Sequence, residues 1–154
     1  MRRINDILEW ICRMMIIVMV LAMTLIIFLQ VVLRYIFSAP LPWPEELGQF
    51  LLVWVSCFGA AYATRYGMNI ALLFIHQRFR GVGRHVVNAF ILFVLLALCV
   101  VCIVEGTIVS LVQWDQVSAS LRIPVTIPYL ALPISFAFVM MFSIEVFIED
   151  LKKK

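Results

Sequence analysis

Charged residues are scarce in this sequence. Aspartate, glutamate, lysine and arginine together make up 14% of the chain, whereas 65% of the residues are apolar and the mean hydropathy is +1.09. A soluble domain of 154 residues could not hide so much apolar surface from water. The composition therefore indicates an integral membrane protein, and it gives no reason to expect a nucleic-acid partner.

Residues that hold cofactors are also few. The two histidines, His76 and His85, fall in one predicted loop, so no histidine pair faces across a membrane to bind a haem. The sequence has no Walker-type loop, no cluster with the spacing of metal ligands and no Ser/His/Asp arrangement. It predicts neither an enzyme nor a bound cofactor or metal.

The four cysteines include one CxxC pair, Cys99 and Cys102, in the middle of an apolar run. This pair raises the possibility of a membrane redox protein of the thiol or quinone type. Redox pairs of that kind lie in loops on the oxidising side, whereas a thiolate within hydrocarbon is disfavoured. We therefore favour structural thiols.

Four uncharged runs have the length of membrane-spanning helices, which is roughly 20 residues. They are residues 14–33, 47–64, 86–104 and 123–144. The alternating segments of about 10 residues that mark transmembrane β-strands are absent. The sequence predicts an all-α integral membrane protein with a single membrane domain, residues 1–154. Its four transmembrane helices are expected at about 14–34, 45–65, 86–106 and 128–148.

The basic residues predict the orientation of these helices. With a cytoplasmic N-terminus, ten of the twelve lysine and arginine residues lie on the cytoplasmic side. The other two, Arg34 and Arg122, lie on the outer side. Because positive residues are enriched in cytoplasmic loops, this split places both termini in the cytoplasm.

Two segments are expected to lie along the inner membrane surface, about 3–13 and 67–79. The first has the apolar period of an amphipathic helix, although an early start of the first span explains it equally well. The first span lacks a small-x-small cleavage site, so we expect it to stay in the chain. The basic residues of the second loop either bind anionic lipid headgroups or only set the topology: Arg78, Arg80 and Arg84.

Two adjacent carboxylates, Glu45 and Glu46, precede the second span directly. Pro42 and Pro44 suit the start of a helix, whose positive dipole end favours negative charge in its first turn. Trp43 is expected at headgroup level. A helix start therefore explains both carboxylates. As an alternative, one of them pairs with Arg34 and fixes the angle between the first two helices.

The second span carries small residues four positions apart, Gly59 with Ala63 and Ser56 with Ala60. Such a strip lets another helix backbone approach closely. Arg65 follows it, and we expect this cation to complement the negative end of the helix dipole. Polar groups within the spans are few, and Glu105 is expected near the outer interface. The chain therefore suits an accessory subunit better than a stand-alone small transporter or channel.

Three motifs in this order resemble one known family. QVVLRY (30–35), PLPWPEEL (40–47) and W-x-x-x-F-G-A-A-x-A-x-R-x-G (54–67) are similar to the small membrane subunit of tripartite ATP-independent periplasmic (TRAP) transporters, the DctQ-like family. LRIPVTIPYLALP (121–133) resembles the start of that family's fourth helix. The sequence departs from the family pattern at Gln49, Asn69 and Leu73, where charged or histidine residues are common.

The resemblance implies a non-catalytic scaffold subunit in the bacterial inner membrane. Its implied partners are a large permease that carries the sodium and substrate sites, and a periplasmic binding protein that delivers an organic acid such as a C4-dicarboxylate or sialic acid. Since the chain ends at LKKK, we expect the permease to be a separate polypeptide. Partner or structural roles are expected for Arg34, Trp43, Glu45, Glu46, Trp54, Gly59, Ala63, Arg65 and Gly67.

Overall fold

The computed structural model describes residues 2–38, 41–78 and 82–152, with side-chain positions in 5–38, 41–66 and 86–148. These residues form α1 (Arg2–Tyr35), α2 (Trp43–Arg78), α3 (Val82–Val112), α4 (Thr126–Tyr129) and α5 (Ala131–Lys152). Within the described ranges the β-structure is limited to one isolated bridge, between Val117 and Pro124. The prediction of an all-α protein is confirmed.

In the described part of the chain, four helical segments are long and apolar enough to cross a membrane: Asn5–Tyr35, Trp43–Tyr66, Val86–Val112 and Thr126–Ile148. The prediction of four spans is therefore confirmed. The fourth span is made of α4 and α5, which are separated at Leu130. Prolines at 124, 128 and 133 remove backbone donors along this stretch, which explains why its first part is irregular.

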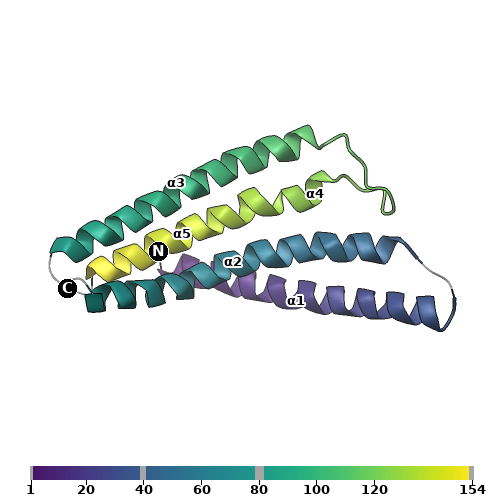
Figure 1. Ribbon diagram of the computed structural model, residues 1–154, viewed down its shortest axis with the longest axis horizontal. Coiled ribbons are helices and arrows are strands. Elements are labelled where there is room, and N and C mark those ends of the chain that lie inside the picture. Colours follow the sequence, from purple (N-terminus) through teal and green to yellow (C-terminus); the bar gives the residue numbers. More distant parts are fainter. Residues whose placement is uncertain (1, 39–40, 79–81, 153–154) are drawn as a thin grey trace.

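The four spans form a single row in the order α1, α2, α5, α3 (Figure 1). Neighbouring helices in this row pack along their length, whereas α1 and α5, or α2 and α3, meet only locally. Helices α1 and α3 do not touch within the described residues, and they form the two edges of the row. The protein is thus one helix thick over most of its width.

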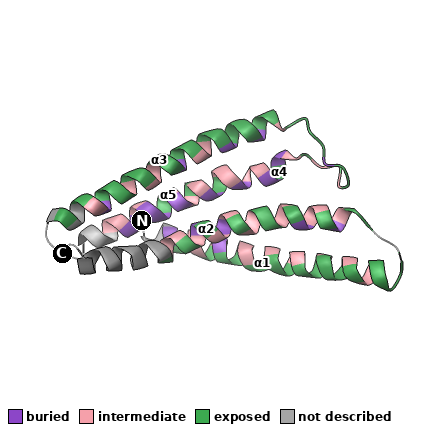
Figure 2. Cartoon of the chain, in the orientation of Figure 1, coloured by how far each residue is buried: buried purple, intermediate pink, exposed green. Residues whose placement is uncertain are grey.

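The interior consists of two small clusters along α2 and α5. Cys12, Phe58 and Phe142 form the first, and it joins α1 to the central pair of helices. Ala61, Cys99 and Val139 form the second, and it joins α3 to the same pair. Figure 2 shows that buried residues lie mainly on α5 and on the parts of the other helices that face it. The remaining apolar surface is exposed, as lipid-facing helices require.

The segments expected at the membrane surface are continuous with the spans. Residues 3–13 are the first turns of α1, and Leu8 and Cys12 pack against the central helices. The backbone of 67–78 continues α2 as far as Arg78. Residue 80 and the side chains of residues 78 and 84 lie outside the described part, so headgroup binding by these arginines stays a prediction.

At Gly106, α3 passes close to α5. A Cβ atom added to Gly106 would lie 3.0 Å from Cδ of Pro133 and 3.3 Å from Cβ of Leu132. One turn later, the Thr126 hydroxyl donates to the carbonyl oxygen of Ser110 at 3.0 Å. A glycine and a hydroxyl bond thus bring the outer part of α3 against α4 and α5.

Candidate functional site

Among the described residues, a group of charged side chains surrounds Arg65, near the ends of the helices where α1 begins and α5 ends. Its guanidinium donates to Oδ1 of Asp6 at 2.7 Å, to a carboxylate oxygen of Glu9 and to the carbonyl oxygen of Asn5 at 3.0 Å. Nη2 also lies 3.5 Å from Oε2 of Glu145. One arginine of α2 therefore binds carboxylates of α1 and α5 together.

This cluster is largely shielded from solvent. The side chain of Arg65 is 15% exposed and that of Glu145 is 7% exposed, and the guanidinium carbon lies 5.7 Å from the centroid of the Phe142 ring. Neither carboxylate oxygen of Glu145 accepts a hydrogen bond within the described residues. Glu145 thus depends on the charge of Arg65, because a shielded carboxylate without a nearby cation is strongly disfavoured.

The expected role of Arg65 as a charge at the end of a helix is wrong. Helix α2 continues to Arg78, and the dipole effect is confined to the last turn of a helix. No strong helix breaker separates the apolar run from the following segment, so the helix extends beyond the predicted span. Arg65 acts instead through its partners on α1 and α5.

Asp6, Glu9 and Glu145 are the residues that sequence reasoning missed. Asp6 and Glu9 belong to the segment 3–13, for which only an amphipathic helix was expected. Glu9 also accepts a hydrogen bond from the Tyr66 hydroxyl at 2.5 Å. The order of the spans could have indicated this group. Because successive helices alternate in direction, these three carboxylates and Arg65 lie at the same ends of their helices.

At the opposite ends of the helices, Glu46 connects α2 to the loop between α3 and α4. Its carboxylate accepts the backbone N–H groups of Ser120 at 2.9 Å and Leu121 at 3.1 Å. The loop is a narrow hairpin, in which the N–H of Ser118 donates to the carbonyl oxygen of Ile123 at 2.9 Å and Arg122 has a φ of 54°. Both glutamates do lie in the first turn of α2, as predicted. Glu46 has this second partner in addition.

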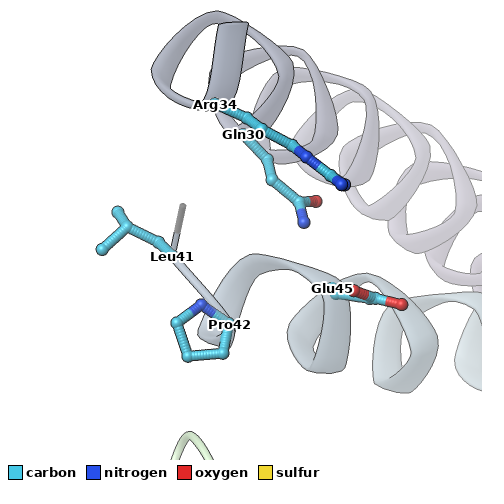
Figure 3. A pocket seen from close by; sticks show the side chains of 5 residues that line it. All are labelled: Gln30, Arg34, Leu41, Pro42 and Glu45. Carbon is cyan, nitrogen blue, oxygen red and sulfur yellow. The ribbon is translucent and has the colours of Figure 1, made fainter. Parts of the chain in front are cut away.

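Arg34 and Glu45 face one pocket of about 280 Å³, which Gln30, Leu41 and Pro42 also line (Figure 3). The predicted ion pair between Arg34 and Glu45 or Glu46 is not formed within the described part of the chain. Glu46 is directed to the hairpin instead, and the guanidinium carbon of Arg34 lies 5.9 Å from the centroid of the Tyr35 ring. This pocket keeps a cation and a carboxylate near each other without direct contact.

The strip of small residues on α2 does not pack against any other described part of the chain. A Cβ atom at Gly59 would meet no atom within 4 Å, and Ser56, Ala60 and Ala63 are exposed. The opposite face of α2 carries the packing instead. There Trp54 stacks on Phe58, with ring centroids 5.7 Å apart.

Trp54 also lines an apolar pocket of about 330 Å³ between α1, α2 and the start of α4. Its other lining residues are Met15, Met19, Leu47, Phe50, Leu51, Ile123 and Ile127. Trp43 and Gly67 are the remaining residues for which a partner or structural role was expected. Trp43 is the first residue of α2 and is half-buried, whereas Gly67 lies within α2 but outside the residues whose packing is described.

The thiols of Cys99 and Cys102 are free, and Cys99 is buried between Ala61 and Val139. Within the described residues, no three His, Cys, Asp or Glu side chains lie close enough together to bind a metal ion. The arrangement therefore offers interhelical charge contacts and open helix faces, which are features of a subunit that packs against other membrane helices.

Comparison with known proteins finds related sequences. A sequence model of the tripartite ATP-independent periplasmic transporters, DctQ component, matches residues 23–153. A Haemophilus influenzae protein assigned as a TRAP transporter small permease is 29% identical over 105 residues, which cover 68% of this chain and 62% of that protein. The isethionate TRAP transporter permease protein DctMQ of Oleidesulfovibrio alaskensis is 30% identical over 126 residues, which cover 75% of this chain and 20% of that protein.

The aligned region thus spans less than two thirds of either relative, whereas the family match extends from the middle of α1 to the last residues of the chain. It includes all of α2, α3 and α4, together with the motifs around Glu46 and Arg65. This multi-pass membrane protein belongs to the DctQ family, the small permease component of TRAP transporters.

Proposed function

We propose that this chain is the non-catalytic scaffold subunit of a sodium-coupled TRAP transporter. The transporter imports an organic acid of the C4-dicarboxylate or sialic acid type across the bacterial inner membrane. A large permease carries the sodium and substrate sites, and a periplasmic binding protein delivers the substrate. Both termini of the small subunit lie in the cytoplasm, in keeping with the ten-to-two split of basic residues.

The observation that carries this proposal is the single row of helices. A transport pathway needs an enclosed polar route, whereas a layer one helix thick has no interior to enclose one. The charged cluster around Arg65 lies towards one end of the spans and not along their length. These features suit a protein that supports a separate transport unit.

A partner much larger than this chain is supported by the length of one relative. The aligned region covers 20% of the DctMQ permease protein, so most of that protein lies outside the part that resembles this chain. A large membrane partner would cover one of the exposed apolar faces of the row. The contacts of Arg65 would keep α1, α2 and α5 in fixed relative positions while that partner moves.

Reconstitution tests this proposal. Liposomes that contain this chain and the large permease, with the binding protein and substrate outside, should take up substrate when a sodium gradient is applied. Liposomes that lack only this chain should show uptake near background. Sodium-driven uptake by the permease without this chain, or flux through this chain alone, would contradict the proposal.

A further inference from the structure

Glu105 lies on α3, the helix that forms one edge of the row. It is exposed, and the side chains along the same edge of α3 are exposed as well: Leu98 by 52%, Val101 by 56% and Ile108 by 49%. In Figure 2 much of α3 is coloured as exposed. We call these four residues the α3 edge. It is an apolar surface with one carboxylate among its apolar residues.

The packing of α3 places Glu105 deep within the spans. Cys99 packs with Ala61 of α2 and Val139 of α5, and the next residue after Glu105, Gly106, packs against Pro133 of α5. At a rise of 1.5 Å per residue, Glu105 lies about 9 Å beyond the level of Cys99. Because α2 runs in the opposite direction to α3, the corresponding level on α2 lies the same distance from Ala61 towards Trp43. That level is the middle of the span Trp43–Tyr66.

This depth differs from the outer-interface position expected for Glu105. The expectation counted about 20 residues from a helix start near Asn88. In the structure α3 is offset along α2 and continues to Val112, two turns beyond Glu105. A carboxylate at this depth lies within a hydrocarbon core of roughly 30 Å.

Glu105 has no ion pair or hydrogen bond from its side chain to any described residue. The described arginines lie near the ends of the spans: Arg13 and Arg65 at one end, Arg34 and Arg122 at the other. Ionisable side chains inside a membrane almost always face protein or water and pair with another group. The α3 edge is therefore incomplete in the isolated chain.

We propose that the α3 edge receives a transmembrane helix of the large permease, and that this helix presents a lysine, an arginine or another hydrogen-bond donor to Glu105. This inference rests on the proposed function and names the surface through which it acts. A second copy of the chain fits less well. A symmetric contact along α3 would bring two Glu105 carboxylates together, and the described arginines are at other depths. The cationic headgroup of a lipid lies at the interface and not at this level.

Photo-crosslinking in membranes tests the contact directly. A photo-reactive amino acid in place of Val101 should give a covalent adduct with the large permease when both proteins are produced together. An adduct between two copies of this chain would overturn the proposal in favour of self-association. The absence of a protein adduct would overturn it in favour of a lipid-facing edge.

Substitution of Glu105 tests the chemistry of the contact. Glu105→Leu should lower recovery of the permease with this chain by about tenfold, because a donor on the permease would lose its partner, whereas Glu105→Gln should lower it less. Thr24→Leu is the matched control. Thr24 is also exposed within a span, but its hydroxyl bonds the carbonyl oxygen of Val20 in its own helix, so recovery should not change.

Recovery of the permease with the unmodified chain distinguishes a failure of the docking surface from a failure of the proposed function. If the parent retains the permease and Glu105→Leu retains it equally, the α3 edge is not the docking surface, although the proposed function stands. If the parent itself does not retain the permease, the proposed function fails and the docking surface fails with it.

Discussion

The carboxylate of Glu46 accepts a hydrogen bond from the backbone N–H of Ser120 at 2.9 Å, although 74 residues separate the two in sequence. The same carboxylate accepts the N–H of Leu121. The start of α2 is thus tied to the hairpin between α3 and α4. This contact links the two halves of the chain at the ends of the helices opposite Arg65.

Replacing Glu46 with Ala should loosen this hairpin. The backbone N–H of Ser120 would lose its acceptor, and that of Leu121 would keep only the Ser118 hydroxyl at 3.2 Å. Hydrogen exchange at Ser120 should therefore become faster, with a smaller change at Leu121, while exchange within α3 stays the same. Hydrogen exchange followed by mass spectrometry measures this difference. Glu45→Ala is the matched control, because Glu45 faces the Arg34 pocket and not the hairpin. Equal exchange in both variants would show that the contact does not hold the hairpin.

Replacing Arg65 with Met should lower the free energy of unfolding by about 3–5 kcal/mol, because it leaves the shielded carboxylate of Glu145 without a cation. Thermal unfolding in detergent measures the loss. A second change, Glu145→Met, should recover part of the lost stability because it removes the stranded charge. If Arg65→Met unfolds at the same temperature as the parent, the cluster does not hold the helices together.

Gly106 and Gly59 form a matched pair for testing helix packing. Gly106→Ala should destabilise the fold by about 1–3 kcal/mol, because the added Cβ lies 3.0 Å from Cδ of Pro133. Gly59→Ala should change the stability of the isolated chain by no more than about 0.5 kcal/mol, since nothing lies within 4 Å of the added atom. Thermal unfolding of the two variants checks both values. Equal losses would mean that α3 does not cross α5 as closely as described.

Reporter fusions test the orientation of the spans. Because ten of the twelve basic residues lie on one predicted side, fusions after Arg80 and after Lys154 should report the cytoplasm. A fusion after Gln116, in the hairpin between α3 and α4, should report the periplasm. Alkaline phosphatase and a cytoplasmic fluorescent protein give opposite signals at each site. A periplasmic signal at Lys154 would exclude an orientation with both termini inside.

The number of spans could be predicted from the sequence because hydrocarbon imposes a length on each apolar run. The runs 14–33 and 86–104 lie inside α1 and α3. The start of α2 was also predictable, since Pro44 and two glutamates mark a first turn whatever surrounds it. These features depend on local sequence and on the membrane.

The contacts between spans could not be predicted in the same way. Arg65 could be placed near one end of the spans, but its choice of Asp6, Glu9 and Glu145 depends on which helices are neighbours in the row. The strip at Gly59 had the familiar spacing of small residues, whereas the close crossing is at Gly106. An apolar face packs against lipid or protein with little difference in composition, so the sequence does not mark which glycine is covered.

The order of helices in the row has a consequence for insertion during synthesis. The span Trp43–Tyr66 of α2 is the least hydrophobic of the spans, and its neighbour α1 is already in the membrane when α2 emerges from the ribosome. Helix α3 emerges before its main neighbour, α5, has been made. It must therefore remain in lipid without its packing partner, and its strongly apolar sequence allows it to do so.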